Sequence, residues 1–123
     1  MLMNTLFVVL LSFGWLLPAV ASSSYLTELT ASAQQGDSVA QFELGQQYYK
    51  GQDVIQNYQE ALKWFTKAAS NGDGDAQYNL GIMYDQGQGV PPNLAQAFYW
   101  YNKAALAGVA AAQSNLGSLY EFG

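Results

Sequence analysis

The sequence predicts an all-α protein, an α/α solenoid built from antiparallel helix-turn-helix repeats. Three observations support this prediction: a fixed period of 36 residues, apolar residues at every fourth position, and helix-capping residues at matching places in successive units. Fixed periods of about 20 to 50 residues are typical of stacked supersecondary units. The period relates Ala40, Ala76 and Ala112; Leu44, Leu80 and Leu116; Gly45, Gly81 and Gly117; Tyr48, Tyr84 and Tyr120; and Gly51, Gly87 and Gly123.

The first helix of each unit is indicated by one apolar stripe. In the first unit Ala40, Leu44 and Tyr48 recur every fourth residue, which places them on one side of a helix. Gly45 lies in the middle of this helix, where glycine costs about 1 kcal/mol relative to alanine. Because the glycine recurs in every unit, we expect a close helix crossing there. Gly51 stands where a left-handed C-cap is expected.

The second helix of each unit begins with a capping pattern. Asn57 can accept from the first-turn amides while Glu60 reaches back to it, and Asn93 with Gln96 repeats this arrangement. A stripe with helical spacing follows. Its members are Ala61, Trp64, Phe65 and Ala68 in the first unit, and Ala97, Trp100, Tyr101 and Ala104 in the second. We expect the recurring aromatic residues Trp64, Trp100, Tyr48, Tyr84 and Tyr120 to pack in the core.

The repeats divide the chain into 36–71, 72–107 and a partial unit, 108–123. Residues 22–35 align with the second helix of a preceding unit and predict an N-terminal capping helix. The sequence reaches Gly123 just after the first helix of the partial unit, so Leu116, Leu119 and Phe122 are expected to lack a covering helix. Two explanations stay open: a fragment of a longer array, or a face covered by a partner, including a homodimer.

Residues 1–21 resemble a cleaved signal peptide. Residues 6–17 are apolar, and Ala19-Val20-Ala21 forms a cleavage pattern. The apolar run is shorter than the roughly 20 residues of a transmembrane helix. Residues 1–5 contain no Lys or Arg, which leaves an uncleaved anchor as the alternative. We therefore expect a periplasmic or secreted protein with no stable membrane insertion after cleavage.

Composition narrows the chemistry. The net charge is −5, which disfavours nucleic acid and anionic lipid as partners. The chain contains no His and no Cys, which removes the commonest base, the commonest metal ligand, the strongest nucleophile and any disulfide framework. The absence of cysteine also excludes a lipid-anchored lipoprotein. We expect no enzyme activity and no cofactor.

One acidic pattern has part of the spacing of a calcium-binding loop. Asn71-x-Asp73-x-Asp75 resembles the start of a calcium loop, which needs Gly at its sixth position and Glu at its twelfth. Counting from Asn71 places Ala76 and Ile82 at these positions. The pattern therefore indicates helix capping, and we expect no metal site.

The repeated motif resembles a known family. The string Ala76-Gln77-Tyr78-Asn79-Leu80-Gly81, then Tyr84, Gly87-x-Gly89-Val90 and Ala97-x-x-Trp100-Tyr101-x-Lys103-Ala104-Ala105, is similar to the Sel-one-like repeat, a relative of the tetratricopeptide repeat. The resemblance covers residues 36–123. It implies a right-handed superhelix with a concave face, and an adaptor or scaffold for protein complexes. Exported bacterial members include regulators of envelope signalling and host-interaction factors.

Two departures from the family pattern bear on structure and function. Asp53 stands where the pattern has its second Gly, so the conformation of that loop is left open. Some members carry a cysteine pair in each hairpin, and a few of these are described as penicillin-binding proteins or weak β-lactamases. Without cysteine this chain fits that subgroup poorly. An envelope enzyme or a penicillin-binding, β-lactamase-like protein is kept as the alternative function.

Candidate binding residues lie on the first helices, next to the Leu-Gly pair, at positions that vary between units. If the repeats stack like tetratricopeptide repeats, these positions face the groove and could dock an extended peptide or a helix. They are Phe42, Glu43, Gln46 and Tyr49, then Tyr78, Asn79, Ile82 and Asp85, then Asn115 with Ser114 and Ser118. Asn79 and Asn115 could hydrogen-bond a peptide backbone, and acidic rims favour basic partners. We therefore expect an exported, non-catalytic adaptor that binds a protein or peptide.

Overall fold

The computed structural model describes residues 23–122, and all regular structure within them is helical. Residues 23–34 form the first helix. Five helices of 13 residues follow: α2 (Ser38–Lys50), α3 (Tyr58–Ser70), α4 (Gly74–Gln86), α5 (Leu94–Leu106) and α6 (Ala110–Phe122). The predicted all-α solenoid is confirmed. The expected signal peptide at 1–21 lies outside the described residues.

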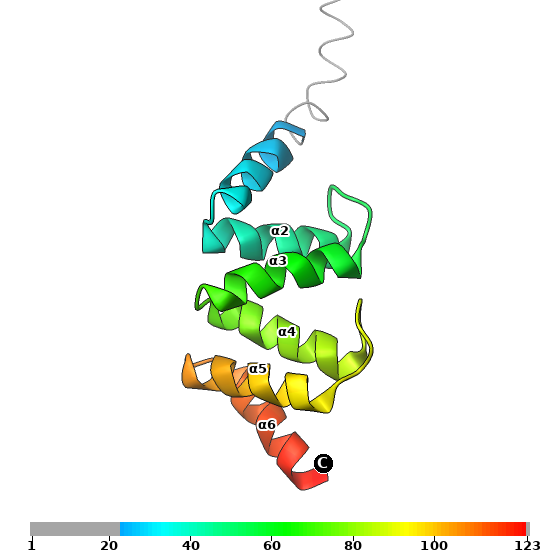
Figure 1. The fold of residues 1–123 in the computed structure, drawn as a ribbon, viewed down its shortest axis with the longest axis vertical. Helices are drawn as coiled ribbons and strands as arrows, with labels where there is room; N and C mark the ends of the chain where they lie inside the picture. Colours follow the sequence, from blue (N-terminus) through cyan, green and yellow to red (C-terminus); the bar gives the residue numbers. More distant parts are fainter. Residues whose placement is uncertain (1–22, 123) are drawn as a thin grey trace, which may run out of the picture.

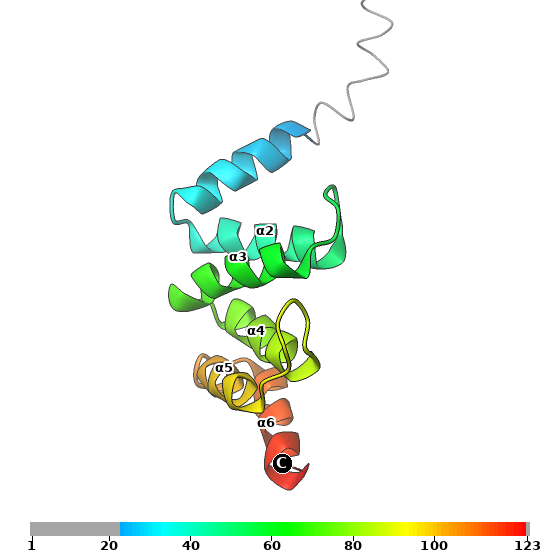
Figure 2. The ribbon, with the colours of Figure 1, turned by 45° about the vertical axis from the view of Figure 1, so that its right-hand side comes forward.

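The helices stack along one axis as successive hairpins (Figure 1). α2 packs mainly against α3, and α4 against α5, while α3 joins α4 and α5 joins α6 across the boundaries between units. The loops within the hairpins, 51–57 and 87–93, project on one side of the stack, and the tight turns lie on the other. The helix at 23–34 lies across α2 at one end, and α6 lies at the other (Figure 2).

The helix starts are set by side-chain caps, as the sequence indicated. Asp37 caps α2, and Asp73 caps α4 by accepting from the Ala76 amide at 2.9 Å. Asp73 therefore caps a helix, as we predicted once the residues from Asn71 onwards did not match a calcium loop. A carboxylate at this place satisfies an orphan amide and also meets the positive end of the helix dipole.

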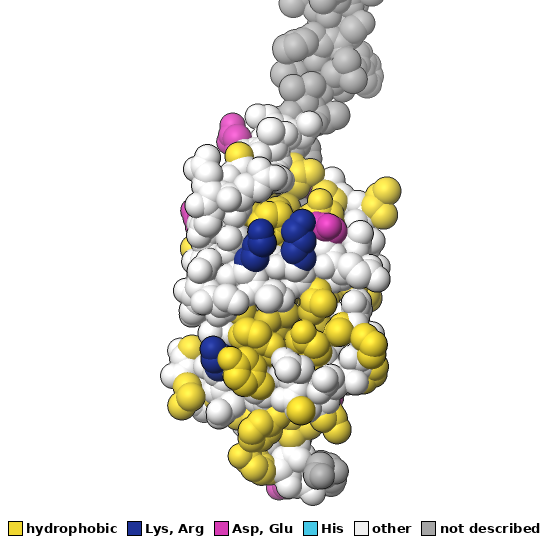
Figure 3. Space-filling view, viewed as in Figure 1, with side chains coloured by type: hydrophobic (Ala, Val, Ile, Leu, Met, Phe, Trp, Pro, Cys, Tyr) yellow, Lys and Arg dark blue, Asp and Glu magenta, His cyan; other side chains and the backbone are white. Residues whose placement is uncertain are grey.

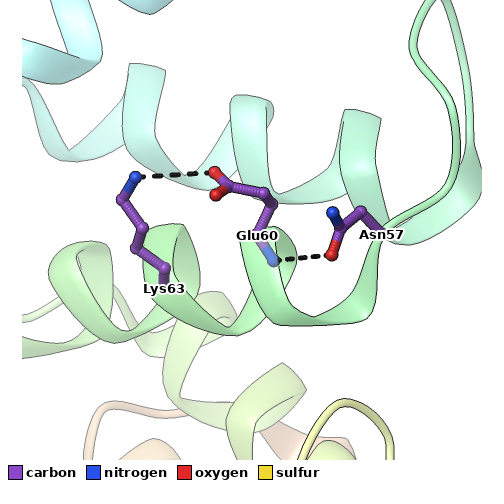
Figure 4. Close-up of polar contacts among 3 residues, drawn as sticks. All are labelled: Asn57, Glu60 and Lys63. Atoms are coloured by element: carbon purple, nitrogen blue, oxygen red, sulfur yellow. Dashed lines mark hydrogen bonds and ion pairs between the residues drawn. The ribbon is translucent and has the colours of Figure 1, made fainter.

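The reciprocal half of the predicted capping box is wrong. Asn57 Oδ1 accepts from the Glu60 amide at 3.1 Å, but the Glu60 carboxylate lies 3.5 Å from Lys63 Nζ instead of returning to the cap (Figure 4). The Asn57 N–H already donates to the Tyr48 carbonyl at 2.9 Å. The hairpin loop thus brings a backbone acceptor to the amide that Glu60 was expected to satisfy. The Asn93 amide makes the matching bond in the second unit.

The expected close crossing at the mid-helix glycines is confirmed in two units. A Cβ added at Gly45 would lie 2.6 Å from Cδ1 of Phe65, and one at Gly81 would overlap the ring of Tyr101 in the same way. Both rings are almost fully buried. At Gly117 the added Cβ would meet nothing within 4 Å. The glycine is therefore needed wherever an aromatic ring of the second helix crosses it.

The core lies between the helices and continues from one unit to the next. Phe65 and Leu80 are fully buried, and Trp64 and Trp100 are 4% and 9% exposed, so their predicted packing role is confirmed. The same prediction was wrong for Tyr120, which is 74% exposed. Within residues 23–122 α6 packs against α5 but is not followed by a second helix of its own unit, and the tyrosine therefore lacks the neighbours that its equivalents have.

The loop with the unusual aspartate keeps the backbone conformation of its counterpart at one key position. Asp53 has φ +56°, and the equivalent Gly89 has φ +72°, so both lie in the left-handed region. Aspartate tolerates that region better than most residues. A Cβ at Gly89 would lie 2.8 Å from the Tyr58 backbone, whereas Asp53 is exposed. Gly51 and Gly87 are left-handed C-caps, as predicted.

Candidate partner-binding face

A row of glutamines fixes each first helix to the preceding second helix. Gln41, Gln77 and Gln113 each donate from Nε2 to the backbone carbonyl eight residues earlier, at 3.1, 3.2 and 3.4 Å. The acceptors lie in the last turn of the preceding helix, where carbonyls lack intrahelical partners. Sequence reasoning missed this role because glutamine usually lies at the surface. Its 36-residue period was the available signal.

The junction of the capping helix with the first unit and the junction of the first unit with the second differ in one hydrogen bond. Gln41 Oε1 accepts from Asn71 Nδ2 at 3.1 Å, so both ends of this buried amide are satisfied. Gln77 Oε1 is also buried, but it has no hydrogen-bond partner among the described residues. Ala107 occupies the position that corresponds to Asn71 and offers no donor. A buried acceptor without a partner costs about 1–3 kcal/mol.

The aromatic residues predicted for the binding face belong partly to the hairpin interiors. The Phe42 ring centroid is 5.8 Å from that of Phe65, and Tyr49 lies 5.3 Å from Tyr58. Tyr78 makes the equivalent contact with Tyr101, at 5.9 Å in the second unit. Phe42, Tyr49 and Tyr78 are half-buried, so each offers only part of its ring to a partner.

Two of the predicted residues, Tyr49 and Asp85, also serve internal hydrogen bonds. The Tyr49 hydroxyl donates to Gln88 Oε1 at 3.0 Å, which ties the first unit to the loop of the second. The Tyr101 hydroxyl donates to Asp85 Oδ2 at 3.4 Å. The pKa of Tyr101 is raised to about 12, mainly by burial. A hydrogen bond with Asn115 lowers this pKa, and the charge of Asp85 raises it further. Tyr49 and Asp85 are therefore engaged within the molecule.

The remaining predicted residues form what we call the first-helix face. Glu43, Ser114 and Ser118 are exposed, and Gln46, Asn79, Ile82 and Asn115 are half-buried. Asn79 Nδ2 donates to the Asp75 carbonyl at 2.9 Å, which leaves its side-chain oxygen as the group available to a partner. The face is thus mainly polar, with an acidic residue in the first unit and amides in the next two.

A hollow opens at the N-terminal end of this face, between the helix at 23–34 and α2. Its floor includes the buried residues Leu29 and Ala40, and Tyr25 donates to Glu43 Oε2 at 3.4 Å beside it. Burial, and then the nearby Glu43 carboxylate, raises the pKa of Tyr25. The lining consists of Tyr25, Glu28, Leu29, Ser32, Asp37, Val39, Ala40 and Glu43.

Sequence reasoning found only one residue of this hollow, Glu43. The others were missed because the capping helix does not carry the repeat motif, so the comparison between units assigned no role to Tyr25 or Glu28. Val39 was missed because it lies outside the Leu-Gly neighbourhood, yet it is 61% exposed. The 36-residue period gives no information on whether an apolar side chain in the first turn of α2 is exposed.

The repeats of this chain match those of known proteins in sequence. A family model described as the Sel1 repeat matches residues 38–73, 74–109 and 110–123. The chain belongs to the Sel1 repeat family. A curated relative is the putative sel1-like repeat-containing protein L18 of Acanthamoeba polyphaga mimivirus, which is 53% identical over 36 residues. That match covers 29% of this chain and 6% of the viral protein.

Three solved structures share the fold. c5321, a protective antigen of uropathogenic Escherichia coli strains with an SLR fold, has 44% identity and a TM-score of 0.74, over 77% of this chain and 20% of that protein. A Sel1 repeat protein from Oxalobacter formigenes has 42% identity and a TM-score of 0.73, covering 74% and 26%. Helicobacter pylori cysteine rich protein B has 26% identity and a TM-score of 0.72, covering 76% and 71%.

The chain therefore spans between 6% and 26% of the length of three of these relatives, and 71% of the Helicobacter protein. Over residues 23–122, no helix has the length and apolar character needed to cross a bilayer. The family and the fold are thus established, and the first-helix face with its hollow is the candidate site for a partner.

Proposed function

We propose that the chain is a non-catalytic adaptor that binds a partner protein or peptide through the first-helix face. Sel1 repeat proteins are generally scaffolds for protein interactions. The observation that carries the proposal is the hollow beside α2, which combines a buried apolar floor with an exposed acidic rim at Glu28, Asp37 and Glu43. Amide and small polar groups continue from it along α4 and α6.

This arrangement favours a particular partner chemistry. An apolar side chain of the partner would lie against Leu29 and Ala40, while an adjacent Lys or Arg would meet Glu43. The rim charges are exposed, so each pair contributes less than about 1 kcal/mol and mainly gives selectivity and faster association. A basic, partly apolar segment is therefore the proposed ligand, with Asn79 and Asn115 available to its backbone.

We further propose that the protein is exported to the periplasm or secreted, and that it acts in envelope signalling or host interaction. The signal-like residues 1–21 support export, as does the similarity to a protein described as a protective antigen. Expression with a reporter fused after Gly123 tests this directly. Recovery of an intact N-terminus in the cytoplasmic fraction would contradict export.

Capture from envelope extract tests the adaptor role. The full chain is compared with Glu43→Lys and with Gln59→Lys, a substitution of an exposed residue on α3. A partner retained by the Gln59 variant but lost with Glu43→Lys is expected, with unchanged thermal unfolding for both. Equal recovery with both variants would remove the acidic hollow from the binding site. Hydrolysis of nitrocefin by the purified chain would contradict the non-catalytic assignment.

Self-association through the α5–α6 end is also proposed. Leu94, Phe98 and Tyr120 are 57%, 37% and 74% exposed there, and the Phe98 and Tyr120 rings meet edge to face at 5.4 Å. Sedimentation of the full chain should show a dimer that Tyr120→Lys dissociates and the charge-matched Tyr25→Lys does not. A monomer at all concentrations would refute the dimer.

A further inference from the structure

The charges of this protein are divided between two kinds of helix. Three of the four basic residues, Lys63, Lys67 and Lys103, lie on the second helices α3 and α5. The fourth, Lys50, ends α2. Only Glu60 among the nine acidic residues lies on α3 or α5. The others are Glu28, Asp37, Glu43, Asp53, Asp73, Asp75, Asp85 and Glu121. An acidic chain therefore has one locally basic surface.

The lysines of this surface lie over aromatic rings. Lys63 Nζ and Lys67 Nζ are 5.0 and 4.9 Å from the Trp64 ring centroid. Lys103 Nζ is 5.1 Å from the ring of Tyr99 and 5.6 Å from that of Trp100. These are distances at which a cation is attracted to the face of a ring. The ammonium groups are therefore held close to apolar surface.

Most of this positive charge is not neutralised locally. Lys63 is 3.5 Å from Glu60, but Lys67 and Lys103 have no ion-pair partner among the described residues. The helix dipole favours a lysine in the last turn of a helix, which explains why Lys67 and Lys103 stand in the last turns of α3 and α5. It does not account for Lys63, one turn earlier over the same tryptophan.

Exposed apolar side chains lie beside the lysines. Tyr99 is 48% exposed and stands on α5 at the position that Lys63 occupies on α3. Leu106, at the end of α5, is 82% exposed. Figure 3 shows lysines and apolar side chains gathered on one face of the molecule. We call Lys63, Lys67, Tyr99, Lys103 and Leu106 the second-helix face.

We propose that the second-helix face is a docking surface for an acidic segment of a partner protein that also carries apolar side chains. Carboxylates of the segment would meet Lys67 and Lys103, and its apolar groups would pack on Tyr99. Because the two faces carry opposite charge, one chain could hold a basic segment on the first-helix face and an acidic one here. The adaptor would then bridge two partners of different chemistry.

Other polyanions fit this surface less well. Binding to nucleic acid or to an anionic bilayer relies on many phosphates neutralised by many basic residues. This face offers only three lysines, and the chain as a whole has a net charge of −5. Long-range repulsion would therefore keep the protein away from a nucleic acid or an anionic bilayer. A short acidic segment needs only two or three contacts, and its apolar side chains use the exposed tyrosine.

The test uses the full chain and a pair of synthetic peptides. One peptide has glutamates around a central phenylalanine, and its counterpart has lysines in place of the glutamates. Tryptophan fluorescence reports binding, because Trp64 and Trp100 lie beneath the lysines. The acidic peptide should bind at low salt and weaken as salt screens the charges, whereas the basic counterpart should not use this face.

Four variants localise the site. The double variant Lys67→Gln/Lys103→Gln should weaken the acidic peptide by up to about 25-fold, since each of the two exposed ion pairs is worth up to about a fivefold change. Tyr99→Ser should weaken it further through the apolar contact. Lys50→Gln is the control compared with Lys67→Gln, since it removes the same charge from a different face and should leave affinity unchanged.

The contrary outcomes are distinct. Equal weakening by Lys50→Gln and Lys67→Gln would reduce the effect to net charge and overturn the proposal. Tighter binding to anionic phospholipid vesicles than to the peptide would assign the face to a membrane instead. Glu43→Lys should not weaken the acidic peptide, so the second-helix face can fail while the first-helix face stands, and the reverse.

Discussion

The first helices α2 and α6 carry the same motif but have different surroundings. In α2, Leu44 is 1% exposed and Gly45 lies under the ring of Phe65. In α6, Leu116 is only half-buried and Gly117 faces open space. Both segments are nevertheless 13-residue helices. The motif therefore forms the helix locally, whereas burial comes from the second helix that packs on it.

The largest expected effect comes from removing a ring on each side of this comparison. Phe65→Ala should lower the free energy of unfolding by about 3–5 kcal/mol, because the side chain is fully buried. At a protein concentration low enough for the chain to be monomeric, Tyr120→Ala should change it by less than about 1 kcal/mol, since the side chain is 74% exposed. Urea unfolding followed by circular dichroism measures both. Similar losses would mean that α6 has a covered face in solution.

The glycine positions give a sharper form of the same contrast. Gly45→Ala forces a methyl group against the Phe65 ring and should destabilise the fold by about 1–3 kcal/mol. Gly117→Ala meets nothing within 4 Å and should stabilise α6 by up to about 1 kcal/mol through helix propensity. The melting temperatures of the two variants, compared with that of the parent chain, test these opposite predictions. Destabilisation by Gly117→Ala would show that a partner or a second copy approaches that helix.

The surroundings of Gln41 and Gln77 can be made alike by one substitution. Ala107→Asn would place an amide donor near Gln77 Oε1, as Asn71 does for Gln41, and should stabilise the fold by about 1 kcal/mol. Ala107→Asp has nearly the same shape but offers no donor, so it serves as the control. If both variants raise the unfolding midpoint equally, the buried oxygen is not the cause.

The smallest effect at neutral pH concerns the ring that replaces Phe65 in the second unit. Burial raises the pKa of Tyr101 to about 12, while an unfolded tyrosine ionises near its ordinary value of 10.0. Above that ordinary value the unfolded chain releases this proton and the folded chain keeps it, so stability falls as pH rises towards 12. Tyr101→Phe should show a smaller alkaline loss of melting temperature than the parent chain. Identical curves would contradict the raised pKa.

The fold followed from the sequence because its determinants are local and recur. The apolar stripe through Leu44, the caps at Asn57 and Asn93, and the left-handed Gly51 each act within a few residues. The capping box failed because the Asn57 amide bonds to the Tyr48 carbonyl across a hairpin loop. The prediction that Tyr120 is buried was wrong because its burial depended on a following helix that the described residues do not contain.

The candidate site was only partly accessible to sequence reasoning. Variation between units pointed to the first helices, but it could not separate Glu43, which faces solvent, from Tyr49, which hydrogen-bonds Gln88. That distinction depends on contacts between residues distant in the chain. The hollow arises where the helix at 23–34, which aligns only partly with the repeat, meets α2, so comparison between the complete units could not locate it.

The glutamine row has a consequence for how such a chain can change its length. Each side chain reaches a carbonyl eight residues earlier, so the bond closes entirely within the segment that joins one unit to the next. Duplication of any 36-residue stretch would carry a complete joint with it, wherever the copy began. A copied hairpin would therefore join its neighbour through the same hydrogen bond, and the stack of helices would lengthen in equal steps without a redesigned junction.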